Sequence, residues 1–178
     1  NNSSLGQIDA GLYREIHIDQ DFRVGDVTVH PFEIPHDAAQ PSAYRISHED
    51  TAVAVATDLG VFSDYIIENM KGLNAVLLEA NHDIHMLETG VYPYPLKRRI
   101  MGNRGHLSNE RSGQLLCELL HDKFGTVVLG HLSKENNTPR LAYDTVSKIL
   151  TDNGAVIGGD FNMWVAPPEG VKRKIELV

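Results

Sequence analysis

The stretch Ala52-Val53-Ala54-Val55-Ala56-Thr57-Asp58-Leu59-Gly60 carries the strongest structural signal in the chain. The apolar run at its start predicts a β-strand, and the glycine at its end predicts a turn. Asp58 therefore lies at the C-terminal end of a strand. A carboxylate in this position, with histidines in three other segments, indicates a metal site.

Length and composition favour an ordinary globular protein. The chain has 178 residues, of which 42% are hydrophobic, and we expect one domain over residues 1–178 with its own core. No apolar run is long enough to span a membrane, and no leader is evident. The single cysteine, Cys117, excludes an internal disulfide and favours the reducing cytoplasm. Because the net charge of the chain is −8, binding of a phosphate-bearing substrate requires a local basic patch or bound cations.

The order of the predicted elements indicates the fold class. Early strands follow one another directly, whereas later strands alternate with helices. This order predicts an α/β fold with a mixed sheet and helices packed on it. The expected later strands are Thr51–Thr57, Ala75–Glu79, Thr126–Leu129, Ala155–Ile157 and Met163–Val165, and the expected helices are Ser63–Met70, Pro93 or Pro95 to Met101, Ser108 or Asn109 to His121, and Pro139–Leu150.

His36, Asp58 and His131 each lie just past a predicted strand. Binding sites in open α/β sheets gather at the carboxyl ends of strands, so these residues can meet. Imidazole and carboxylate groups suit zinc, manganese or iron. One carboxylate can bridge two metal ions ~3.5–4 Å apart, as in two-metal hydrolases. For each histidine, an ordinary polar loop position is the alternative.

His106 precedes a predicted helix, between Gly105 and a cap at Ser108 or Asn109. Free backbone N–H groups and the helix dipole favour anions at such a position. A protonated imidazole there can donate its proton to a leaving oxygen. The alternative is a turn histidine that hydrogen-bonds its own loop.

Further polar and basic residues are expected around this edge. Glu79-Ala80-Asn81-His82-Asp83 follows another strand, and we expect His82 or Asp83 at the rim of the site. Lys97-Arg98-Arg99, with Arg104 nearby, leads into the His106 loop. This cluster is either a solvated helix face or a contact for a phosphate backbone.

Together these segments resemble the metallo-β-lactamase superfamily, and within it the YycJ/WalJ-type metallo-hydrolases. The resemblance extends from about Phe22 onward and implies part of an αββα sandwich. More distantly, the chain resembles RNA-processing nucleases of the same superfamily, in which Pro35-His36 followed by Tyr44-Arg45-Ile46 is similar to the third metal motif. The segments that carry the resemblance are Thr57–Gly60, Leu78–Asp83, Tyr92-Pro93, Leu96–Ile100, Gly105–Glu110, His131–Ser133 and Asn136-Asn137.

The resemblance implies a site and an activity. His36 would bind one divalent ion, His131 the other, and Asp58 would bridge both, with zinc or manganese as the metal. His106 would protonate the leaving group or hold the scissile phosphate. A metal-bridging hydroxide would then attack a phosphodiester, with 5′→3′ exonuclease action on DNA as the implied activity. The residues expected to contact substrate are His82, Asp83, Arg98 and Arg99. The alternatives are a hydrolase of a small ester, thioester or lactam, and a noncatalytic module.

One feature of the superfamily is not found in this sequence. Its principal metal motif, H-x-H-x-D-H, has no counterpart, and His82-Asp83-Ile84-His85 does not match it. We therefore expect the C-terminal portion of such a protein, with weak metal binding and little turnover alone. An uncovered sheet face or edge is also expected, which predicts association with the N-terminal half or with a second copy.

Overall fold

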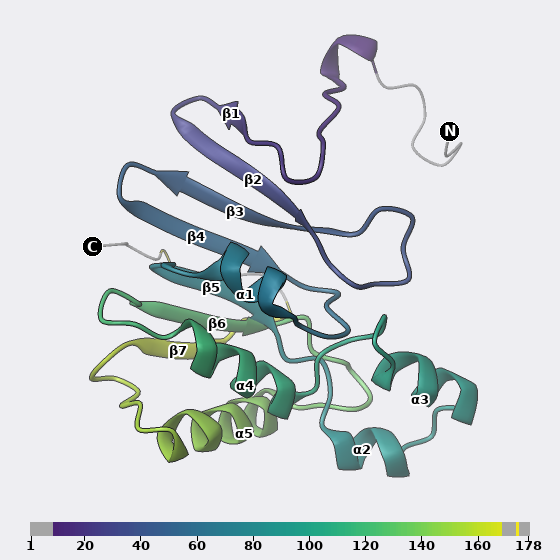
Figure 1. Ribbon diagram of the computed structural model, residues 1–178. Helices are drawn as coiled ribbons and strands as arrows, with labels where there is room; N and C mark the ends of the chain where they lie inside the picture. The colour runs from purple at the N-terminus through teal and green to yellow at the C-terminus, as the bar shows by residue number, and fades with distance from the viewer. Residues whose placement is uncertain (1–8, 169–173, 175–178) are drawn as a thin grey trace.

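A seven-stranded mixed sheet forms the centre of the computed structural model, which describes residues 9–168 and 174 (Figure 1). The strands lie in the sheet in their order along the chain. Neighbours from β1 to β4 are antiparallel, and neighbours from β4 to β7 are parallel. The strands are β1 (Phe22–Val24), β2 (Val27–Glu33), β3 (Ser42–His48), β4 (Thr51–Ala56), β5 (Ala75–Glu79), β6 (Thr126–Gly130) and β7 (Asn162–Val165). The prediction of an α/β fold with a mixed sheet is confirmed.

The helices lie between the parallel strands, because a parallel pair needs a crossover connection. Three of them, α1, α4 and α5, pack on one face of the sheet, and α2 and α3 lie beyond its carboxyl edge (Figure 1). No helix in the described part of the chain is long and apolar enough to cross a bilayer. The helices are α1 (Asp64–Met70), α2 (Ile84–Thr89), α3 (Tyr94–Met101), α4 (Asn109–Leu119) and α5 (Pro139–Asp152).

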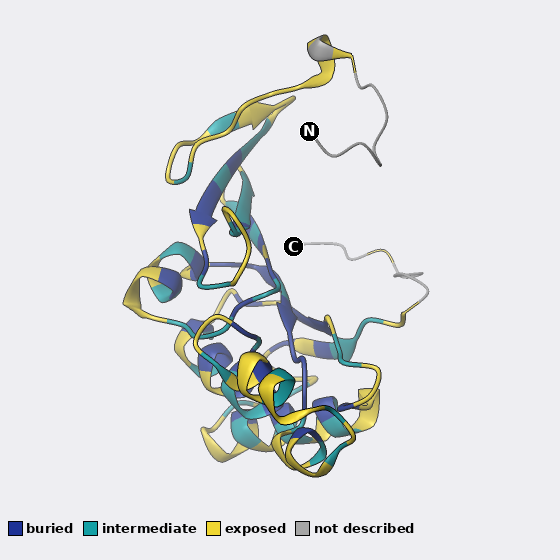
Figure 2. Cartoon of the chain, turned by 90° about the vertical axis from the view of Figure 1, so that its right-hand side faces the viewer, coloured by how far each residue is buried: buried dark blue, intermediate teal, exposed yellow. Residues whose placement is uncertain are grey.

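The helix-covered face of the sheet forms the core. Side chains alternate between the two faces of a strand, so Ala52, Ala54 and Ala56 of β4 are buried in this core. Leu78 of β5 and Leu129 of β6 are fully buried beside them. Burial is concentrated in the strands and helices of this region, whereas β1 and the segment before it are mostly exposed (Figure 2).

The opposite face of the sheet is also apolar, and it is only partly buried. Val55, Leu77, Val128 and Trp164 lie side by side on it in the registers of β4 to β7. Val55 remains 40% exposed. The described residues provide no second layer of helices or strands over this face.

One local prediction was wrong, and one helix was not predicted. Ala155–Ile157 is not a strand, because a turn with Gly158 at φ +84° follows it directly and leaves one isolated bridge, Ile157 to Phe161. Helix α2 was not predicted, since its six residues are too few to show a helical period. It begins at a local signal instead, the Asp83 side chain accepting a hydrogen bond from the Met86 amide at 2.7 Å.

Candidate metal centre

The direction of the strands explains how distant segments reach one place. Strands β2 and β4 are each antiparallel to β3, so they point the same way as β5 and β6. Their carboxyl ends therefore share one edge of the sheet. His36 follows β2, Asp58 follows β4, Glu79 ends β5 and His131 follows β6.

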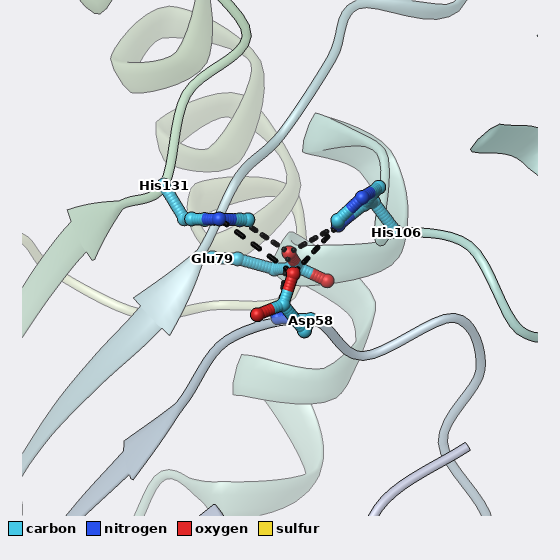
Figure 3. A group of neighbouring side chains, drawn as sticks. All are labelled: Asp58, Glu79, His106 and His131. Atoms are coloured by element: carbon cyan, nitrogen blue, oxygen red, sulfur yellow. Dashed lines mark hydrogen bonds and ion pairs between the residues drawn. The ribbon is translucent and has the colours of Figure 1, made fainter. Parts of the chain in front are cut away.

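Four side chains converge at this edge (Figure 3). Asp58, Glu79, His106 and His131 each present a potential ligand atom within 4.8 Å of the others. Asp58 Oδ1 lies 3.6 Å from His131 Nε2, 3.5 Å from His106 Nδ1 and 3.6 Å from His36 Nε2. One carboxylate oxygen thus faces three imidazoles, and the predicted metal residues His36, Asp58 and His131 are brought together.

Two of the imidazoles are oriented by hydrogen bonds on their far side. His36 Nδ1 donates to the Gly105 carbonyl at 3.0 Å, which directs Nε2 toward Asp58. His131 Nδ1 donates to Glu79 Oε2 at 3.1 Å and likewise presents Nε2. Metal-binding histidines in proteins are held in this way. The imidazole and carboxylate donors fit zinc, and the carboxylate also suits manganese.

Glu79 organises the centre from beneath. Its side chain is fully buried, and both oxygens accept hydrogen bonds of 2.7–3.2 Å. Because these bonds occupy its lone pairs, Glu79 positions the surrounding loops and has little capacity left to bind an ion. Its donors are the backbone N–H groups of Asp58, Leu59 and Leu107 and the Nδ1–H groups of His106 and His131.

The same contacts shift two pKa values. Burial by itself would raise the pKa of Glu79, but hydrogen bonds from His106, His131 and the Leu107 amide outweigh it and lower that pKa. The bond to Glu79 in turn raises the pKa of His131 against the opposing effect of burial. Glu79 is therefore ionised at neutral pH.

Two residues of the centre have strained backbones. Asp58 has φ 60° and His131 has φ 56°, a left-handed conformation that few non-glycine residues adopt. Such conformations persist only where surrounding contacts enforce them, and they are concentrated at functional sites. Here Glu79 binds the Asp58 amide, and Asn81 Nδ2 donates to the His131 carbonyl at 2.9 Å.

Close backbone packing places the His106 loop. A Cβ atom on Gly60 would lie 2.4 Å from the Asn103 carbonyl oxygen, and one on Gly105 would lie 2.0 Å from the Ile100 carbonyl oxygen. Only glycine fits at these two positions. They let the loops after β4 and α3 approach closely enough for His106 to face Asp58.

A buried amide network holds the loops behind the centre. Asn109 and Asn137 exchange two hydrogen bonds of 2.8 and 3.1 Å, and Asn137 Nδ2 also donates to the Ala80 carbonyl at 2.8 Å. Ser112 Oγ donates to the Glu79 carbonyl at 2.6 Å. Satisfied buried polar networks rigidify a structure, so several polar residues of the distinctive segments have a supporting role.

The residues expected to contact substrate have diverse surroundings. His82 is 2% exposed, and Asp83 caps α2. Arg99 forms an ion pair with Asp37 that lowers the pKa of the aspartate, and Lys97 Nζ donates to two carbonyls at the end of α2 at 2.7 Å. Arg98 is exposed on α3. Substrate contact by His82, Asp83, Arg98 and Arg99 stays a prediction.

The role of Glu79 was missed at the sequence level. The signal was the one that identified Asp58, a carboxylate directly after an apolar strand. What the sequence did not indicate is that Glu79 is buried beneath three loops and Asp58 is 42% exposed above it.

Comparison with known proteins identifies the family. Residues 6–131 match the model of the beta-lactamase superfamily domain, so the chain belongs to this superfamily and the resemblance is confirmed. It is 33% identical over 169 residues to exodeoxyribonuclease WalJ of Streptococcus pneumoniae serotype 2, and 36% identical over 154 residues to exodeoxyribonuclease YycJ of Bacillus anthracis. These alignments cover 95% and 86% of this chain, which spans 63% and 58% of the length of the two relatives.

Solved structures support the fold. The metallo-beta-lactamase fold protein YhfI of Bacillus subtilis has a TM-score of 0.54 and 18% identity, over 83% of this chain and 50% of that one. A diphosphatase from the PhnP family has a TM-score of 0.55 and 18% identity, over 91% of this chain and 48% of its own. At these identities, the likeness is one of fold alone.

Proposed function

We propose that the protein containing this chain is a divalent-metal-dependent nuclease that hydrolyses phosphodiester bonds in DNA. The observation that carries the proposal is the Asp58 carboxylate facing His36, His106 and His131 at the carboxyl edge of the sheet. The two relatives named exodeoxyribonucleases support DNA as the substrate. We also propose that the protein is cytoplasmic and that residues 1–178 belong to one domain.

In this proposal, His36 and His131 would each hold one divalent ion, and Asp58 would serve both. When bound, divalent ions lower the pKa of a coordinated water and neutralise charge that develops on a phosphodiester. Each ion would then have two ligands from this chain. Further ligands come from an additional polypeptide segment or a second copy, which would also cover the open apolar face of the sheet.

His106 is the proposed proton donor. Its Nδ1–H bonds to Glu79 Oε2 at 3.2 Å, so Nε2 is the atom that carries the proton for a leaving oxygen. Glu79 thus orients the His106 ring. Alternatively, the Nε2–H group of His106 holds the scissile phosphate.

A second candidate is hydrolysis of a small ester, thioester or lactam at the same centre. The observation that favours it is the state of the basic cluster. Lys97 and Arg99 are engaged within the protein, and the net charge of the chain is −8. A substrate without a polyanionic backbone would need no wider basic surface.

The first test is the Asp58→Ala substitution in the whole protein, with Asp144→Ala on the exposed face of α5 as control. Asp58→Ala should abolish hydrolysis of a labelled DNA strand and lower the metal content per chain, measured by elemental mass spectrometry. Asp144→Ala should change neither. Retained activity in Asp58→Ala would remove the bridging role.

The second test separates the two substrate classes. Arg98→Gln combined with Arg104→Gln should raise KM for DNA and reduce the salt dependence of binding, with a log–log slope lower by roughly 0.7–0.9 per lost phosphate contact. Lys148→Gln on α5 is the matched control. If the double variant hydrolyses DNA with unchanged KM and salt slope, Arg98 and Arg104 do not contact the DNA backbone. The small-substrate alternative is favoured if the wild type hydrolyses an ester, thioester or lactam and leaves DNA uncut.

A further inference from the structure

A small cavity adjoins the metal centre on the side of α4. Its volume is about 270 Å³, and His106 belongs both to its wall and to the metal centre. This is below the ~300–1,000 Å³ of pockets that hold drug-sized ligands, so it suits a group such as a phosphoryl with part of its sugar. Its polar wall consists of His82, Asn103, His106, Ser108 and Arg111.

Arg111 gives this cavity a positive charge. The guanidinium lies 4.4 Å from the centroid of the Phe62 ring, and Nη1 donates to Gln114 Oε1 at 3.0 Å. The ion pairs of lysine and arginine among residues 9–168 and 174 do not include Arg111, and no acidic side chain lines the cavity. In a chain with a net charge of −8, a guanidinium held in place without a carboxylate partner is available for an anionic ligand.

His82 supplies an independent sign of a ligand. The residue is 2% exposed and lines the cavity, and its Nδ1 is enclosed without a hydrogen-bond partner in the described part of the chain. Buried polar groups are nearly always paired, so an unpaired one beside a cavity indicates a missing partner. His82 is thus a residue of the cavity wall with a polar atom that the described part of the chain leaves unpaired.

The start of α4 lies at the wall of the cavity. Ser108 caps this 11-residue helix, and its Oγ accepts the Arg111 amide at 3.3 Å. The backbone N–H of Asn109 donates to the His82 carbonyl at 2.9 Å, which joins the helix start to the His82 segment. The N-terminus of a helix carries partial positive charge and favours phosphate.

We propose that this cavity is an anion subsite that binds a phosphoryl group of the substrate strand next to the one being cut, with Arg111 as its main contact. The inference rests on the proposed nuclease function for its substrate. Positioning a neighbouring phosphate would fix the register of the strand over the metal centre. The group bound is either a terminal phosphate or an internal one.

The binding test needs no activity. Inorganic phosphate is titrated into the metal-stripped whole protein while the His82 ring signals are followed by NMR. We expect a saturable shift in the wild type and in Arg140→Gln, whose side chain is 92% exposed on α5. The shift should be lost in Arg111→Gln and weakened in Arg111→Lys, which keeps the charge without the planar fork. The absence of a shift in the wild type overturns the proposal.

The kinetic test distinguishes the two sources of phosphate. Arg111→Gln should raise KM roughly 10-fold, the loss expected for one charge-assisted contact, with kcat retained. If KM rises only for strands that end in phosphate, the bound group is a terminal phosphate. If KM rises equally for strands that end in hydroxyl, the bound group is an internal phosphate. Unchanged KM on both overturns the subsite. If the wild type does not cut DNA, the nuclease proposal fails, while the NMR titration still decides the cavity.

Discussion

The antiparallel strands β1–β3 and the parallel strands β4–β7 belong to one sheet but contribute unequally to the core and the metal centre. All five residues of β6 are buried, whereas β1 and β3 contain mostly half-buried or exposed positions. Asp58, Glu79 and His131 come from the ends of parallel strands, and only His36 follows an antiparallel one.

The difference follows from the connections. Parallel strands require crossovers, so every loop that leaves a strand's carboxyl end emerges at the same edge, and the crossover helices bury one face. Hairpins alternate in direction, so only one antiparallel connection, from β2 to β3, reaches that edge. The geometry of the parallel part thus accounts for both its dense core and its share of the site.

The largest expected effect compares two glutamates at strand ends. Glu79 ends β5 fully buried, and Glu33 ends β2 exposed. Glu79→Gln should lower the free energy of unfolding by about 3–5 kcal/mol, because buried N–H donors lose their acceptor. Glu33→Gln should stay within about 0.5 kcal/mol of the wild type. Urea unfolding measures both free energies. Equal losses would contradict the unequal contributions of the parallel and antiparallel parts of the sheet.

A smaller effect is expected in the packing of the sheet itself. Leu129 of β6 is fully buried, whereas Ile46 of β3 is half-buried. Leu129→Ala should cost about 2–5 kcal/mol, and Ile46→Ala about 1 kcal/mol. Thermal and urea unfolding provide the measurement. If Ile46→Ala costs more than this expected value, the open face of the sheet is covered in the folded protein.

The smallest effect concerns acid stability. Burial, followed by the charge of His106, lowers the pKa of His82 from 6.5 to about 4. The unfolded chain therefore takes up the proton first, and stability should fall by up to about 3 kcal/mol as the pH drops from 6.5 to about 4.

Replacing His82 tests this acid dependence. His82→Gln should flatten the stability curve across that pH window, measured by urea unfolding with a chelator present. The exposed His85→Gln controls for removal of a histidine as such. An unchanged slope in His82→Gln would show that His82 does not titrate with folding.

Much of this arrangement follows from local sequence. The apolar runs predicted β4, β5 and β6. The polar residues just past the predicted strands, with His36 after β2, predicted that His36, Asp58 and His131 would meet. Capping signals likewise predicted the start of α4 near Ser108. These features depend on short stretches of chain, which a single sequence reports directly.

Other features depend on which segments become neighbours. The sequence determined the α/β class, the strand ends and the residue types suited to a metal. Only the tertiary structure decided that Glu79 lies beneath the centre, that Arg99 pairs with Asp37, and that Arg111 and His82 share a cavity. The physical reason is that burial and pairing are set by contacts between residues far apart in the chain, and a local pattern does not encode which partner a side chain meets.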